Sequence, residues 1–184
     1  MEGAHVGFGW LHASRQCYAP AMSHPTSIWL EISHHAAFRV GGWAWVRADG
    51  VSVTGRAGGD RRTDPERTAL AGLIAAVGQA PGLGPVQLHT TSELVAAIPA
   101  RIKAAQAGEN PPTGNLDLWA QATTALAASP VVIVPSLRTL GAPTAFAAAW
   151  AELARDKAKD KGPFTYPIPK ANLAKAGVGA SAKP

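Results

Sequence analysis

One carboxylate and three histidines form the first group of candidate metal ligands in the sequence. Glu31 is followed closely by His34 and His35, and His89 ends a later strand-like run. Carboxylate and imidazole groups together suit transition metals. Adjacent histidines in a loop point to different sides, however, and a single strand histidine is more often hydrogen-bonded than ligating. The sequence therefore predicts no dedicated metal site and leaves Glu31 as the single candidate ligand.

Four arginines are the second group of candidates, because guanidinium groups bind nucleic-acid phosphates. They are Arg39, Arg61, Arg62 and Arg67. The chain has a formal net charge of +5 and a pI near 9.7, which permits binding of a polyanion without demanding it. Asp64 and Glu66 lie beside these arginines in the sequence and would repel phosphate.

Length and composition limit the classes of protein. A chain of 184 residues with 47% apolar and 16% charged residues is expected to fold as one domain. Cys17 is the only cysteine, so no intrachain disulfide forms, and a cytoplasmic location is expected. No apolar stretch reaches the roughly 20 residues of a membrane span, so no membrane partner is expected.

Periodic segments predict the elements that must position these side chains. Strand-like runs cover 26–33, 41–47, 51–56, 85–90 and 131–134, and helical spacing covers 64–79, a helix after Ser92, 116–127 and 144–159. Asp49 and Gly50 separate two strand-like runs and predict a hairpin. The order predicts an α/β fold with a mixed five-stranded sheet, three antiparallel strands then two parallel ones, and helices on both faces.

The two ends of the chain are expected to lie outside this domain. Residues 1–25 show no periodicity and are predicted to be a poorly ordered leader, in which either Met1 or Met22 is the start. The domain is predicted to span 26–161, followed by a tail over 162–184 rich in Pro, Ala and Lys. Phe164, Tyr166 and Ile168 alternate in this tail, which fits docking onto a partner or folding back over its own sheet edge.

Five short sequence motifs, in the right order over roughly 26–160, carry a resemblance to a known family. They are Glu31-Ile32-Ser33 followed by Gly41-Gly42-Trp43, the segment 59–70, the segment 89–95, Asn115-Leu116-Asp117-Leu118-Trp119, and Ala151-Glu152-Leu153-Ala154-Arg155. The chain resembles the bacterial type 1 ribonuclease H family. That resemblance implies a ribonuclease H-like fold and hydrolysis of the RNA strand of an RNA/DNA hybrid, using two Mg²⁺ ions roughly 4 Å apart.

The carboxylates that this chemistry requires are mostly missing. The four family positions fall on Glu31, Ala69, Thr91 and Ala151. The family also places a mobile histidine in the loop before the last helix, and the segment 135–143 contains none. Removing ligands of this kind abolishes most metal affinity. The resemblance therefore implies a degenerate, catalytically inactive member that needs no cofactor, with Mg²⁺ or Mn²⁺ relevant only if activity survives.

Three functional hypotheses remain open from the sequence. The first is a role with RNA/DNA hybrid or RNA without cleavage. The second is a protein-interaction or structural module that docks through its tail. The third is an active ribonuclease whose metal centre combines Glu31 with Glu66, one turn before Ala69, and with Glu93 or Glu152. As a purely structural alternative, Glu31 pairs with Arg39 or Arg62.

Overall fold

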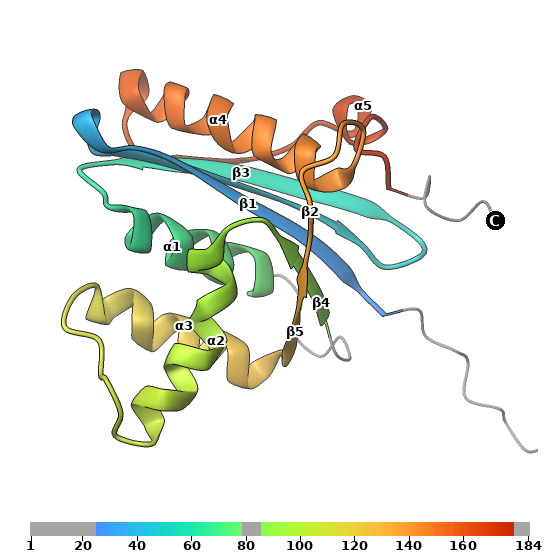
Figure 1. The fold of residues 1–184 in the computed structure, drawn as a ribbon. Coiled ribbons are helices and arrows are strands. Elements are labelled where there is room, and N and C mark those ends of the chain that lie inside the picture. Colours follow the sequence, from blue (N-terminus) through green and yellow to red (C-terminus); the bar gives the residue numbers. More distant parts are fainter. Residues whose placement is uncertain (1–24, 79–85, 179–184) are drawn as a thin grey trace, which may run out of the picture.

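The computed structural model describes residues 25–78 and 86–178 (Figure 1). The predicted leader over 1–25 lies outside the described residues except for Pro25, as does the end of the tail from 179. Within the described part of the chain, no helix combines the length and the apolar character needed to cross a membrane.

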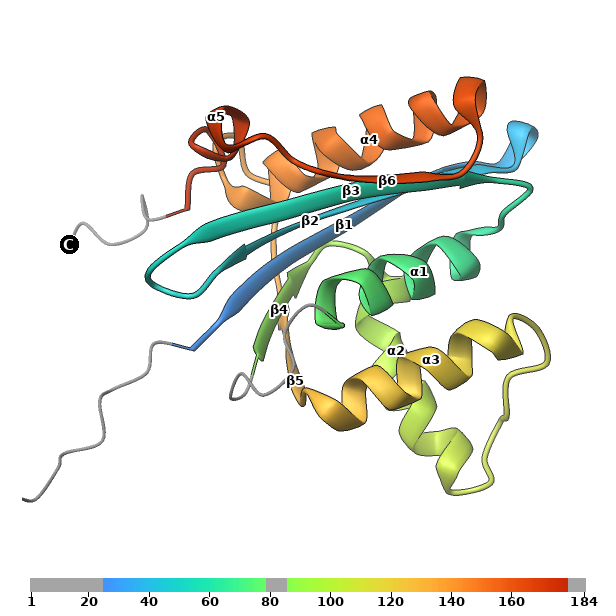
Figure 2. The same ribbon diagram turned by 180° about the vertical axis from the view of Figure 1, so that it is seen from behind.

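A mixed sheet with the strand order β5-β4-β1-β2-β3-β6 forms the centre of the molecule. Its strands are β1 (Ser27–His35), β2 (Val40–Ala48), β3 (Val53–Arg61), β4 (Val86–Thr90), β5 (Val131–Pro135) and β6 (Phe164–Pro167). The helices are η1 (Ala36–Phe38), α1 (Pro65–Val77), α2 (Glu93–Gln106), α3 (Leu116–Ala128), α4 (Pro143–Lys161) and α5 (Lys170–Leu173). Helices α1, α2 and α3 cover one face and α4 and α5 the other, as Figures 1 and 2 show from opposite sides. The predicted α/β class and helices on both faces are confirmed.

The prediction of five strands is wrong, because the sheet has six. β6 pairs antiparallel with β3 and forms one edge of the sheet, and Ile168 N donates a further hydrogen bond to Gly55 O at 2.9 Å. This strand lies in the segment predicted to be a tail, so that segment folds back over its own sheet edge. It is only four residues long and ends in Pro167, so the alternation of Phe164, Tyr166 and Ile168 fits an edge strand and a docking segment equally well. An edge strand tolerates proline.

The antiparallel part of the sheet is built around the predicted hairpin. The side chain of Asp49 accepts hydrogen bonds from the backbone N–H groups of Val51 and Ser52 at 3.0 and 2.7 Å, which fixes the turn. β3 extends beyond its predicted end at 56 to Arg61. Its glycines at 58 and 59 disfavour a strand locally but are needed for packing, since a Cβ on Gly58 would overlap the Trp43 ring.

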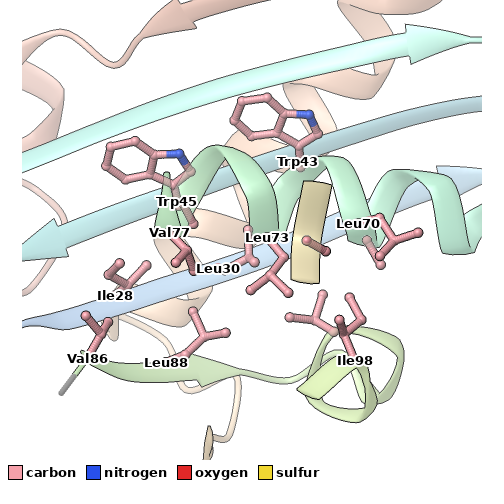
Figure 3. Packing of buried hydrophobic residues seen from close by; sticks show 14 of the residues in the cluster. Ile28, Leu30, Trp43, Trp45, Leu70, Leu73, Val77, Val86, Leu88 and Ile98 are labelled. Carbon is pink, nitrogen blue, oxygen red and sulfur yellow. The ribbon is translucent and has the colours of Figure 1, made fainter. Parts of the chain in front are cut away.

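The larger core lies between the sheet and α1. Ile28, Leu30, Trp43 and Trp45 of the sheet and Leu73 of α1 are among its buried members, which Figure 3 shows packed together. Helix α1 begins where Asp64 Oδ1 accepts a hydrogen bond from Arg67 N at 2.7 Å, with Pro65 in the first turn.

On the opposite face, small residues let α4 approach the sheet closely. Ala44, Ala57, Ala151 and Ala154 are fully buried there, and a Cβ on Gly42 would meet the α4 backbone. This apposition fixes α4 along its length and so positions the loop that precedes it, between β5 and α4.

Candidate functional site

Glu31 is the buried acidic residue at the centre of the candidate site. It lies on β1, its relative exposure is 0%, and both carboxylate oxygens accept hydrogen bonds from Thr91. The Thr91 backbone N–H donates to Oε1 and its hydroxyl to Oε2, each at 2.6 Å. Thr91 directly follows β4, which runs parallel to β1. The fold therefore brings Glu31 and Thr91 into direct contact.

Arg138 completes this arrangement and is the residue that sequence reasoning missed. Its Nη2 lies 3.0 Å from Glu31 Oε2 and 3.3 Å from Thr91 Oγ1, and its side chain is 48% exposed. The structural alternative paired Glu31 with Arg39 or Arg62, and that pairing is wrong, because Arg138 provides the counter-charge. One feature of the sequence could have indicated Arg138 as the partner of Glu31, because it is the only ionisable residue in the loop 136–142.

The other two family positions lie in apolar packing on opposite faces of the sheet. Ala69 is 1% exposed and belongs to the cluster beneath α1, whereas Ala151 is 0% exposed and belongs to the cluster beneath α4. Neither methyl group adds polarity to the surroundings of Glu31.

These residues do not fit a two-metal centre. Mg²⁺ requires several oxygen ligands and local negative charge, and the neighbourhood of Glu31 supplies one carboxylate. Both of its oxygens already accept hydrogen bonds, and the positive charge of Arg138 is in contact with it. Across the described ranges 25–78 and 86–178, no three His, Cys, Asp or Glu side chains cluster in a way that could hold a metal.

Glu66, the proposed second ligand of a rearranged centre, is engaged elsewhere. Its carboxylate accepts hydrogen bonds from Arg101 Nη1 at 2.6 Å and Asn115 Nδ2 at 3.0 Å, and Arg101 also stacks over Trp119. Burial alone would raise the pKa of Glu66, but the hydrogen bonds from Asn115 and Arg101, together with the Arg101 charge, hold the pKa below its ordinary value. Glu66 thus ties α1 to α2 and α3.

Glu93 and Glu152, the further candidates for a rearranged centre, are exposed residues of α2 and α4. Neither has a hydrogen bond or ion pair with Glu31 in the described part of the chain.

The four candidate arginines divide into two groups. Arg67 forms a two-point ion pair with Asp117, with contacts of 3.2 and 3.1 Å, and this hydrogen bonding raises the pKa of Arg67. Arg39, Arg61 and Arg62 are exposed, and no carboxylate among the described residues lies within ion-pair distance of them.

Arg39 and Arg62 also have unusual backbone conformations. Their φ angles are 50° and 58°, in the left-handed region that costs a non-glycine residue about 1–2 kcal/mol. The two turns are joined by a hydrogen bond of 3.0 Å from Thr63 N to Arg39 O. The guanidinium groups are therefore presented by two coupled, strained turns at one end of the sheet.

The three histidines within the described residues do not converge. His34 Nε2 lies 3.2 Å from the carbonyl oxygen of Thr63, and the His35 ring packs against Phe38. His89 stacks on Trp29 with 5.2 Å between ring centroids, and its Nδ1 is 3.2 Å from Ser136 Oγ. Burial lowers the pKa of His89, which favours the neutral ring. Each ring has a separate structural environment.

Comparison with solved structures shows that the fold of the chain is a known one. One match is LC9-RNase H1, described as a type 1 RNase H with the type 2 active-site motif, at 17% identity and a TM-score of 0.61, covering 89% of this chain and 86% of that one. A second is the N-terminal RNase H domain of Rv2228c from Mycobacterium tuberculosis, at 21% identity and a TM-score of 0.54, covering 73% of this chain and 95% of that one.

A third match is RNase H1 from the halophilic archaeon Halobacterium salinarum NRC-1, at 21% identity and a TM-score of 0.50, covering 73% of this chain and 99% of that one. No protein-family model and no curated protein matches the sequence. At these identities the likeness concerns the architecture. The chain has the ribonuclease H-like α/β fold.

Proposed function

We propose that this protein is a non-catalytic ribonuclease H-like domain that binds nucleic acid, either an RNA/DNA hybrid or RNA. The observation that carries the proposal is the Glu31–Arg138 pair, in which a buried carboxylate is neutralised by a guanidinium. With Ala69 and Ala151 at two other family positions, the remaining residues support binding and not two-metal hydrolysis.

Electrostatics explains why a single carboxylate is insufficient. A divalent cation near Glu31 would gain attraction from one negative charge and meet repulsion from Arg138, whose Nη2 is 3.0 Å from that carboxylate. Displacing Arg138 would also remove a hydrogen bond that stabilises a fully buried charge. The pair therefore supports loss of the hydrolytic reaction.

The nucleic-acid part of the proposal is supported by charge and by fold. The net charge of +5 and the exposed Arg39, Arg61 and Arg62 provide phosphate-binding groups. The structures that the chain resembles are described as RNases H. The docking hypothesis loses support, because Phe164, Tyr166 and Ile168 pack on the protein's own sheet.

The decisive experiment measures cleavage and binding on the same substrate. Purified protein is incubated with an end-labelled RNA/DNA hybrid in Mg²⁺ and in Mn²⁺, and its affinity for the same hybrid is measured by fluorescence anisotropy at increasing salt. We expect no cleavage and an affinity that falls steeply with salt.

A Glu31→Gln variant, which keeps the shape of the side chain, serves as the control. Cleavage by the wild-type protein that Glu31→Gln abolishes would overturn the non-catalytic assignment. Absence of any nucleic-acid binding at low salt would overturn the binding assignment.

A further inference from the structure

Exposed cations and one exposed aromatic ring gather where three segments meet. These segments are η1, the turn after β3 and the C-terminal end of α4, which lie at the same end of the sheet in Figures 1 and 2. We name this surface the basic end and define it as Phe38, Arg39, Arg61, Arg62, Lys159 and Lys161.

Direct contacts make the basic end one continuous surface. Lys159 Nζ lies 3.8 Å from the centroid of the Phe38 ring, which joins α4 to η1. A Cβ on Gly162, directly after Lys161, would lie 3.1 Å from Arg61 Nη2, so α4 also meets the end of β3.

The charge balance of the basic end favours a polyanion. Its five cations are accompanied in the same segments by Asp60, Asp156 and Asp160. Asp156 is already paired with Arg155 at 2.7 Å. No ion pair neutralises the five cations within the described ranges. Closely spaced cations of this kind bind successive phosphates and release their counterions.

Phe38 distinguishes the basic end from a simple patch of charge. Its side chain is 54% exposed, and its neighbours on this surface are Lys159 and the His35 ring. An exposed aromatic ring among cations is the arrangement on which unpaired bases stack, and duplex bases are already stacked on one another. The ring therefore favours single-stranded nucleic acid over a closed duplex.

The strained turns support a ligand-binding role independently of charge. Arg39 and Arg62 both adopt positive φ at positions where glycine or asparagine would be unstrained. Such strain concentrates at functional sites, because it is retained where a side chain is needed in one place. At the basic end, two turns keep arginines despite this penalty.

We propose that the basic end binds single-stranded nucleic acid, with phosphates on Arg39, Arg61, Arg62, Lys159 and Lys161 and one base stacked on Phe38. This inference rests on the proposed function and specifies the class of nucleic acid and the surface. It adds the α4 lysines and the η1 aromatic ring to the arginines that the sequence indicated.

The test compares two labelled probes by fluorescence anisotropy: a single-stranded RNA of about ten nucleotides and a blunt RNA/DNA hybrid of the same sequence. We expect tighter binding of the single strand by the wild-type protein. Phe38→Ala should weaken single-strand binding about 5- to 100-fold, whereas Phe38→Tyr should retain it, because stacking needs the ring. Lys159→Ala with Lys161→Ala should lower the salt slope by about 0.7 per lost phosphate contact.

The control is Lys170→Ala with Lys175→Ala, which removes two exposed lysines at or just after α5, at the opposite end of α4. This variant should change affinity far less. If the wild-type protein binds both probes and neither Phe38→Ala nor the α4 lysine variant changes the affinity, this inference is overturned. The proposed function would then remain intact. If the protein binds neither the single strand nor the hybrid, both this inference and the proposed function are overturned.

Discussion

Arg138 and Glu31, separated by 107 residues in the chain, meet at 3.0 Å in the centre of the candidate site. The Arg138 side chain is half-exposed, whereas the Glu31 side chain is fully buried. A protein side chain thus supplies the positive charge that stabilises the buried acid, and this relationship leads to the first two predictions.

Removing Arg138 should destabilise the fold, because Glu31 would keep a buried charge whose only remaining polar partner among the described residues is Thr91. We expect Arg138→Met to lower the free energy of unfolding by about 1–3 kcal/mol. The double variant Glu31→Gln with Arg138→Met should lose less stability than the two single variants together. The reason is that the double variant removes both partners of the ion pair and so leaves no unpaired charge. Urea unfolding measures all three. Additive costs would show that the two side chains are not coupled.

Divalent metal should bind only after the site is made acidic. The wild-type protein should leave the electron paramagnetic resonance signal of free Mn²⁺ unchanged at millimolar metal. Thr91→Asp with Arg138→Ala places a second carboxylate beside Glu31 and removes the cation, and should reduce the free Mn²⁺ signal. Thr91→Asp alone is the matched control. Mn²⁺ binding by the wild-type protein would contradict the argument from Arg138.

Arg39 should show opposite effects on stability and binding. Arg39→Gly removes the left-handed penalty while adding backbone freedom to the unfolded chain, so the free energy of unfolding should stay unchanged or rise by up to about 1 kcal/mol. Nucleic-acid affinity should fall, because a phosphate-binding cation is lost. Ala37→Gly changes a nearby residue that does not have a positive φ. This change should instead lower the free energy of unfolding by about 0.5–1 kcal/mol. Thermal unfolding and anisotropy measure the two effects.

His89 should make stability depend on pH in the mildly acidic range. Burial holds the pKa of His89 below the ordinary value of 6.5, so the unfolded chain binds a proton more readily than the folded one. The contribution of neutral His89 to the free energy of unfolding is therefore fully present above pH 6.5. It is lost as the pH falls through the lower pKa of the folded state. His89→Gln should flatten this part of the profile of unfolding free energy against pH. A profile unchanged by His89→Gln would exclude His89 as its origin.

The C-terminal segment should behave as part of the domain. Leu173 is 6% exposed and packs in the cluster beneath α4 and α5, so Leu173→Ala should lower the free energy of unfolding by about 2–4 kcal/mol. Leu140, which is 98% exposed, provides the matched control, and Leu140→Ala should have little effect. Equal stability of the two variants in urea unfolding would show that the segment after β6 does not support the core.

Several elements could be predicted from local patterns alone. Asp49 and Gly50 predict a turn because their chemistry is local, and Asp64 and Ser92 cap helices that begin at the next residue. β6 could not be predicted this way, since Phe164 and Tyr166 pair with β3 over 100 residues earlier. Short edge strands depend on a partner that the local sequence does not contain.

For the candidate site too, some features follow from the sequence alone and others only from the tertiary structure. The sequence by itself determined which residues stand at the four positions that the resemblance indicates. They are Glu31, Thr91, Ala69 and Ala151, and of these only Glu31 has a carboxylate, because residue identity and order are enough for that. Only the tertiary structure decided that Arg138 neutralises Glu31 and that Lys159 joins Phe38. These contacts link segments far apart in the chain, and close packing of α4 on the sheet brings them together, which no local pattern of residues encodes.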